Sequence, residues 1–353
     1  MPSILMLHEH ADGGMPQSVE DEVSLLRRHG MPVETMALDM TDSRPSLWRG
    51  SQAGATYNRL SQAIQDCGAQ VLHIHNRWPS VPSVVYRAAR DANLAVVQSL
   101  EERCVSCIDK GCRNCQGRRS GEEGVSPAKG LRAGMRRLAA LWRQQVDRFV
   151  ARDDVTRQHY AAAGLPLRRI ALKPDVCPDP GRAASTWGRP RQGVLVLGAA
   201  VDMPELGALL NDLPVPVTLI GEGMNSLDLG SGVRQLGALN RDALSREMSM
   251  AQLLLLPSLG GEASCSSVFD ALAHGLPVLG AQPGVLCPGV TGELLPMDGR
   301  DGWREALLAM LADRKRLIRM GEASRRLYEE RYAPAVLYRT AMDIYRAAIA
   351  EAP

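Results

Sequence analysis

Short apolar runs alternate with amphipathic stretches along almost the whole chain, and this alternation constrains the fold more than any other feature of the sequence. Such alternation is typical of an α/β protein with parallel sheets. In the first half the runs lie at 4–8, 32–38, 71–75, 95–100, 148–151 and 169–173. In the second half they lie at 193–197, 217–220, 233–236, 253–257 and 277–280. The sequence therefore predicts two successive βα halves.

The predicted helices and one irregular segment divide the chain. Helical patterns cover 18–29, 82–92, 242–249, 302–313, 315–331 and 333–350. The segment 174–191 is rich in Pro, Gly and Arg and lacks periodicity, which predicts an exposed connection between domains. We expect an N-terminal domain over 1–180 and a C-terminal domain over 190–333, with a final helix, 334–350, that can pack on the first domain. A length of 353 residues and 45% hydrophobic residues agree with two cores.

Composition excludes several classes of protein. The formal net charge is only +2, which argues against a general nucleic-acid binder. No apolar run approaches the roughly 20 residues that span a bilayer. The N-terminus lacks the charged start and the cleavage site of a secretory signal. We therefore expect a cytoplasmic protein.

Strings in both halves match a known pattern. The first half contains Gly13-Gly14 with Glu20-Asp21-Glu22, His73-Ile74-His75-Asn76 with Trp78-Pro79, Val146–Ala151 and Ala163-Gly164-Leu165-Pro166. The second contains Gly221-Glu222-Gly223, Leu255–Leu259, the run from Glu262 to Val278, and Val290–Pro296. Together these strings resemble the retaining glycosyltransferases of family 4 over nearly the whole chain. The resemblance implies an α/β fold of the GT-B type, in which two Rossmann-like domains face a central cleft. It also implies an acceptor bound mainly by the first domain and a nucleotide-sugar donor bound by the second.

The donor contacts that the resemblance implies centre on two acids. Glu262 would lie near the transferred sugar, and Asp270, where the family has a second Glu, would bind the ribose hydroxyls. The helix start that carries Ser264, Ser266 and Ser267 offers amides to a phosphate. Gly198 and Glu222, each after a predicted strand, are further candidate substrate contacts. Taken alone, the two acids are explained equally well as solvated residues of a helix.

The family's usual phosphate-binding cations are missing. Family members carry Gly-Arg, followed about five residues later by Lys, after the first strand of the second domain. Here the segment 198–205 reads Gly-Ala-Ala-Val-Asp-Met-Pro-Glu. Because such cations stabilise charge on the leaving phosphate, three explanations stay open. Cations arrive from elsewhere, the donor lacks a diphosphate as a CMP-sugar does, or the chain is a catalytically inactive binding or partner subunit.

The candidate acceptor side also departs from the family pattern. Glu101 stands where the family commonly has a cleft-facing His. Glu101 would act as a base, or it is part of a reshaped acceptor pocket. His75 and Asn76 end a strand and would face the cleft, although His75 is explained equally well as a satisfied loop residue. The Gly13-Gly14 loop allows close approach of a substrate, or simply forms a turn. Glu262, Glu101 and His75 are the candidate catalytic residues.

Four of the eight cysteines form a compact cluster. Cys104, Cys107, Cys112 and Cys115 make two Cys-x2-Cys pairs. Paired thiolates are typical of a structural zinc site, and an iron–sulfur cluster uses the same ligands. A thiol-rich loop without metal is the alternative. A site in which all four cysteines bind the metal leaves no position for substrate, so its role would be to order a loop or to form a contact surface.

The stretch 129–148 combines basic and apolar residues in a helical pattern. A basic amphipathic helix can lie on an anionic membrane surface, where a lipid-linked acceptor would be found. An ordinary packed helix with a solvated basic face explains the pattern as well. The sequence thus predicts sugar transfer from a nucleotide-sugar to a glycan, lipid-linked or other acceptor, with peripheral contact at the inner face of the membrane as an open alternative.

Overall fold

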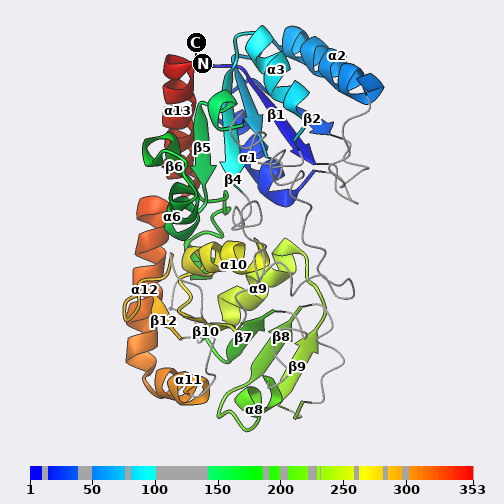
Figure 1. Cartoon of the computed structure of the whole chain (residues 1–353). Coiled ribbons are helices and arrows are strands. Elements are labelled where there is room, and N and C mark those ends of the chain that lie inside the picture. Colours follow the sequence, from blue (N-terminus) through cyan, green and yellow to red (C-terminus); the bar gives the residue numbers. More distant parts are fainter. Residues whose placement is uncertain are drawn as a thin grey trace. The chain divides into compact units, whose positions relative to one another are not determined.

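The computed structural model of the chain is shown in Figure 1. It describes residues 1–9, 15–38, 50–75, 81–100, 142–185, 191–198, 206–221, 229–230, 232–257, 262–280, 285–295 and 302–352. The chain divides into two compact units. The first unit comprises Met1–Asp175 and Leu337–Pro353, and the second comprises Val176–Val336.

The first unit is built on a six-stranded parallel sheet in the order β2-β1-β3-β4-β5-β6. Its elements are β1 (Ile4–Glu9), α1 (Gln17–Arg28), β2 (Val33–Leu38), α2 (Gly50–Cys67), β3 (Val71–Ile74), α3 (Ser83–Asp91), β4 (Ala95–Leu100), β5 (Arg148–Ala151), α6 (Asp154–Ala162), η1 (Leu167–Arg169), β6 (Ile170–Leu172) and α13 (Pro334–Glu351). The strand order reverses its direction between β1 and β3. In open parallel sheets, ligands bind outside the carboxyl ends of the strands at such a reversal.

Helices cover both faces of this sheet. Because side chains alternate between the faces of a strand, Leu5 and Leu7 of β1 join the core beneath α2 and α3. Ile4 and Met6 join the opposite core, beneath α1 and α13. Strands that are buried on both faces consist of continuous apolar runs, which explains why they could be recognised in the sequence. The final helix therefore completes the core of the first unit, although it follows the second unit along the chain (Figure 1).

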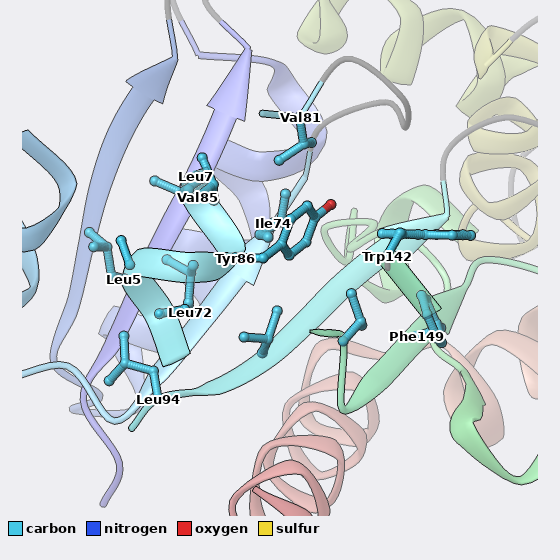
Figure 2. Close-up of a cluster of buried hydrophobic side chains, with 14 of the residues drawn as sticks. Leu5, Leu7, Leu72, Ile74, Val81, Val85, Tyr86, Leu94, Trp142 and Phe149 are labelled. Atoms are coloured by element: carbon cyan, nitrogen blue, oxygen red, sulfur yellow. The ribbon is translucent and has the colours of Figure 1, made fainter. Parts of the chain in front are cut away.

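A buried hydrogen-bonded group lies inside the layer formed with α2 and α3. The side-chain carbonyl of Gln98 accepts hydrogen bonds from the Tyr86 hydroxyl at 2.9 Å and from the Trp142 indole N–H at 2.6 Å. The Trp142 ring also packs edge-to-face on Phe149, with the centroids 5.0 Å apart. Figure 2 shows these aromatic rings among the aliphatic side chains of the layer. A single amide thus connects α3, β4 and the segment before β5.

The second unit contains another six-stranded parallel sheet, in the order β12-β11-β10-β7-β8-β9. Its elements are α7 (Arg182–Ser185), β7 (Val194–Leu197), α8 (Leu206–Leu210), β8 (Val217–Ile220), β9 (Val233–Leu236), α9 (Arg241–Met250), β10 (Leu253–Leu256), α10 (Glu262–Ala273), β11 (Val278–Gly280), β12 (Gly292–Leu294), α11 (Trp303–Ala312) and α12 (Arg314–Arg331). Numbered within the unit, the strands lie 3-2-1-4-5-6, which is the order of a Rossmann sheet. The reversal here falls between β7 and β10.

Two helical layers also enclose the second sheet. Leu254 and Leu256 of β10 pack in a core with residues of α9 and α10. Leu253 and Leu255 face the other core, with residues of α8, α11 and α12. At the edge of the sheet, β12 approaches β11 so closely that a Cβ on Gly292 would lie 2.0 Å from the Val278 carbonyl oxygen. Only glycine fits that position.

The predicted α/β class is confirmed, and all the predicted strands are present with small differences at their ends. Helix α2 and strand β12 were not expected from the sequence. The predicted exposed connection over 174–191 is confirmed only in part, because Pro178, Asp179 and Arg182 are exposed whereas Val176, Cys177 and Arg191 are buried. The Arg191 guanidinium donates to the carbonyls of Ala184 and His274 at 2.9 and 2.6 Å. Buried polar partners, which composition does not reveal, hold this segment in place.

Within the described residues, no helix is long and apolar enough to cross a bilayer.

Candidate active site

The second unit places two predicted donor contacts at the reversal of its sheet. Gly198 directly follows β7, and its backbone N–H donates to the Ile220 carbonyl at 3.3 Å. Glu262 is the first residue of α10, the helix that follows β10. Because β7 and β10 are parallel neighbours, both positions lie at the same edge of the sheet. The first turn of α10, which includes Ser264, carries amides without intrahelical partners and the positive end of the helix dipole, which together favour an anion.

Asp270 lies farther along α10 and is half-buried. The Cys177 thiol donates to its Oδ1 atom at 2.9 Å, and the Tyr328 hydroxyl donates to the Cys177 carbonyl at 2.8 Å. The carboxylate predicted to bind ribose is therefore oriented by a buried thiol at the start of the second unit. Ser266 and Ser267 precede it on the same helix, half-buried and buried respectively.

The first unit has a cluster of polar side chains at its own sheet reversal. His73 lies in β3 and is fully buried, and His75 follows the strand with 7% of its surface exposed. The His75 backbone N–H donates to the Leu7 carbonyl of β1 at 2.8 Å, which extends the pairing of these strands by one residue. His75 thus lies at the carboxyl edge where a ligand of the first unit is expected.

Glu22 of α1 and Lys173, which follows β6, form a buried ion pair beside these histidines. The Lys173 Nζ atom lies 2.8 Å from Glu22 Oε2, and both side chains are 4% exposed. The Tyr345 hydroxyl of α13 donates to Glu22 Oε1 at 3.2 Å. The same hydroxyl lies 2.9 Å from His73 Nδ1, and His73 Nε2 lies 3.1 Å from the Ser99 hydroxyl.

The hydrogen bonds assign the protons of this cluster. A tyrosine hydroxyl has one hydrogen, so if Tyr345 donates to the Glu22 carboxylate it must accept from His73 Nδ1. His73 Nε2 then accepts from the Ser99 hydroxyl. With this assignment Glu22 receives hydrogen bonds on both oxygens, as a buried carboxylate requires.

Burial and neighbouring charges set the ionisation of the cluster. Burial opposes the charge on Glu22, but Lys173 and the two histidines outweigh it and lower the Glu22 pKa to about 2. Burial lowers the His73 pKa well below its ordinary value. Burial likewise lowers the His75 pKa to about 4, with Lys173 adding to the effect and Glu22 opposing it. At neutral pH the cluster therefore holds one ion pair and two neutral imidazoles.

The ligand atoms of Glu22, His73 and His75 lie within 4.8 Å of one another, as in a metal centre. However, the Lys173 ammonium already contacts the Glu22 oxygen that would bind a cation. Both ring nitrogens of His73 are also within hydrogen-bond distance of other side chains. The arrangement therefore fits a protein ion pair better than a metal site.

Two cavities lie away from both sheet reversals. One, of about 480 Å³, is lined by Gly193, Pro216 and Gly232, which precede strands of the second sheet. The other, of about 630 Å³, is lined by Asp147 and Arg169, among others, which precede strands of the first. Both are at the amino ends of their strands, opposite the edge where parallel sheets bind ligands. We therefore assign neither to the candidate active site.

The family strings include Glu22, His73 and His75, but sequence reasoning did not predict the buried cluster that they form with Lys173 and Tyr345. Glu22 left a detectable signal, since it lies on the apolar face of α1 between Val19 and Val23, where a charge requires a buried partner. Lys173 had a weaker signal, as a charge at the end of an apolar run. Tyr345 had none, because it is separated from Glu22 by 323 positions.

Several predicted residues fall outside the described part of the chain and stay predictions. They are Gly13, Gly14, Asn76, Glu101, Glu222, Cys104, Cys107, Cys112 and Cys115. The side chains of Glu262 and Ser264 are likewise not described. Most of the basic stretch 129–148 also lies outside. Of its described arginines, Arg143 donates to the Ala163 carbonyl at 2.7 Å, and Arg148, which lies in β5, pairs with Glu351 at 2.6 Å.

Comparison with known proteins agrees with this geometry. Residues 183–313 match the family described as glycosyl transferases group 1, a range that contains β7, β10 and α10. The chain is 28% identical over 316 residues to a phosphatidyl-myo-inositol mannosyltransferase of Mycolicibacterium smegmatis, covering 82% of this chain and 74% of that protein. A protein of the same name from Mycobacterium leprae is 24% identical, with 90% and 89% covered. The chain is a glycosyltransferase of the GT-B fold.

Solved structures support the fold of this glycosyltransferase. Anabaena HepE in complex with UDP superposes with a TM-score of 0.69 at 13% identity, covering 98% of this chain and all of that one (100%). Sucrose-phosphate synthase from Thermosynechococcus elongatus gives a TM-score of 0.69 at 13% identity, with 99% and 100% covered. The GT-B fold expected from the sequence motifs is thus confirmed.

Proposed function

We propose that this glycosyltransferase moves a sugar from a nucleotide-sugar donor to a glycan, lipid-linked or other hydroxyl acceptor, with retention at the anomeric carbon. The observation that carries the proposal is the family match over 183–313, which includes the sheet reversal and α10. Complexes of HepE with UDP and with UDP-glucose support a nucleotide-sugar donor. The mannosyltransferase relatives, named for a phosphoinositide, support a lipid-linked acceptor. These comparisons favour a transferase over a binding or partner subunit.

In this proposal the second unit binds the donor. Glu262 holds the sugar hydroxyls, Asp270 holds the ribose, and the start of α10 with Ser264, Ser266 and Ser267 receives the phosphate. Gly198 and Glu222 are the remaining donor contacts in this proposal. The bond between the anomeric carbon and the phosphate oxygen breaks as the acceptor oxygen attacks from the same face. The acceptor proton passes to the departing phosphate, so no separate protein base is required.

The first unit binds the acceptor in this proposal. His75 and Asn76, at the end of β3, contact it together with the Gly13-Gly14 loop and Glu101. A cysteine cluster of Cys104, Cys107, Cys112 and Cys115 that holds a structural zinc would order the segment beside Glu101. Metal analysis of the purified protein and of Cys107→Ser tests this part, with one zinc per chain expected in the former and less in the latter.

The neutralisation of a donor diphosphate is the open chemical question. Two described arginines of the second unit are committed to protein groups. Arg191 donates to main-chain carbonyls, and Arg325 donates to both carboxylate oxygens of Asp179 at 2.8 and 2.9 Å. A donor without a diphosphate, such as a CMP-sugar, needs fewer cations. The identity of the nucleotide therefore distinguishes this explanation from cations supplied by another part of the chain.

A calorimetric titration against UDP-, GDP-, dTDP-, ADP- and CMP-sugars tests the proposal. We expect saturable binding of one donor, lost in Glu262→Ala and kept in Glu322→Ala, which removes an exposed acid of α12. Preference for a CMP-sugar would explain the missing cations. If folded protein binds no donor, the transferase proposal fails and a binding or partner subunit replaces it.

A further inference from the structure

The buried pair of Glu22 and Lys173 adjoins the histidine proposed to face the acceptor. We propose that Lys173 is a positioning residue that, through Glu22, keeps His75 an uncharged hydrogen-bonding group, so that the first unit recognises a neutral hydroxyl. This proposal rests on the proposed function, in which His75 contacts the acceptor. It adds Lys173, a residue that sequence reasoning did not select, and the group of the acceptor that His75 recognises.

The geometry places Lys173 and His75 in competition for one oxygen. Glu22 Oε2 lies 2.8 Å from the Lys173 ammonium and 3.8 Å from His75 Nε2. The longer distance exceeds that of a hydrogen bond. His75 Nε2 is buried and has no hydrogen-bond partner among the described residues. Lys173 thus takes the carboxylate contact that would otherwise draw a proton onto His75.

The rest of the cluster prevents Glu22 from turning toward His75. Tyr345 binds the other oxygen of Glu22, and His73 binds Tyr345. These contacts come from α13 and β3, while Glu22 belongs to α1 and Lys173 follows β6. Four separate segments therefore hold the carboxylate with Oε2 directed at the ammonium.

Several of the described segments bring titratable groups close to His75. The groups that face it are His8 of β1, Glu22 of α1, His73 of β3, Lys173 and Asp175 after β6, and Tyr345 of α13 through Glu22. Burial lowers the His75 pKa most, Glu22 and Asp175 raise it, and Lys173 and His8 lower it. Lys173 thus offsets part of the carboxylate effect, and together with burial it keeps the imidazole neutral at physiological pH.

A neutral imidazole has one donor and one acceptor nitrogen, which matches a hydroxyl that also donates and accepts. A phosphate or carboxylate only accepts and prefers a cationic donor. The group recognised at His75 is therefore a sugar or polyol hydroxyl and not an anionic part of the acceptor. An anionic headgroup, if the acceptor has one, must bind elsewhere.

Ring-NMR titration of the histidines in the full chain, without donor or acceptor, tests the electrostatic step. His75→Gln assigns the resonance. We expect a His75 pKa of about 4 in the wild type. In Lys173→Met, where the unpaired carboxylate faces His75, the pKa should rise by at least about one unit. Lys173→Arg should keep it low, and Arg168→Met, which removes an exposed cation before β6, should leave it unchanged.

Two results would overturn the proposal. One is a wild-type His75 whose pKa lies near the ordinary histidine value of 6.5. This result would overturn the proposal even if Lys173→Met does not fold. The other is an unchanged His75 pKa in folded Lys173→Met. Since this titration uses no substrate, it is independent of donor binding, whose absence would instead defeat the proposed function.

Turnover with the donor that binds gives a second test. Lys173→Met should raise the acceptor KM several-fold at unchanged donor KM. Equal acceptor KM values for the wild type and Lys173→Met would also overturn the proposal.

Discussion

Removal of Lys173 should destabilise the first unit far more than removal of Lys173 and Glu22 together. In Lys173→Met, the Glu22 carboxylate stays in a site where only 4% of its side chain reaches solvent, without the ammonium at 2.8 Å. Breaking a buried ion pair by deleting one partner typically costs about 3–5 kcal/mol. Replacing both partners by neutral side chains of similar volume is often nearly neutral. The variant Lys173→Met/Glu22→Gln should therefore recover most of the lost stability.

Native-state hydrogen exchange on the full chain measures this cycle. The two units need not unfold together, so a single denaturation midpoint is not a suitable measure. The amides of β1 and β3 report the opening of the first unit, and those of β10 in the second unit serve as an internal control. A cost below about 1 kcal/mol in Lys173→Met would refute the reasoning. So would a double variant whose cost equals the sum of the two single costs, because the pair would then not be coupled.

Three further measurements test individual contacts. Acid should destabilise the first unit because the unfolded chain binds protons more readily than the folded one. Both buried histidines, His73 and His75, contribute as pH falls below 6.5, and Glu22 contributes about 3 kcal/mol as pH falls from 4.5 toward 2. Exchange measured against pH should show the Glu22 contribution disappear in Glu22→Gln. Gly292→Ala should cost about 1–3 kcal/mol in hydrogen exchange of the β10 and β11 amides, since its Cβ would meet the Val278 carbonyl oxygen. Gly232→Ala, with nothing within 4 Å of the added Cβ, should be nearly neutral, and equal effects of the two variants would contradict the steric argument. Gln98→Met removes the acceptor shared by two buried donors and should cost about 2 kcal/mol in exchange of β4 amides, whereas an unchanged rate would show that the amide is dispensable.

The elements of both sheets could be predicted because their signals are local. A strand such as Leu253–Leu256 is buried on both faces, so its apolar run is visible without knowledge of its partners. The start of α10 was indicated instead by the family string that begins at Glu262. The family strings then indicated the GT-B fold. By contrast, the Pro, Gly and Arg content of 174–191 suggested full exposure, whereas Arg191 is buried. Its guanidinium donates to the main-chain carbonyl of His274, which is distant in the sequence.

The sequence by itself determined the two βα halves, the position of helix α10 and the class of enzyme. Tertiary structure alone decided the side-chain partners. Lys173 meets Glu22 across 151 positions, Tyr345 meets it across 323, and Cys177 meets Asp270 across 93. The periodicity of apolar residues indicates which positions are buried. It does not indicate which distant side chain pairs with a buried charge, because the fold alone brings the two together. The ion pair beside His75 therefore forms only when α1 and α13 pack on the sheet that contains β3 and β6.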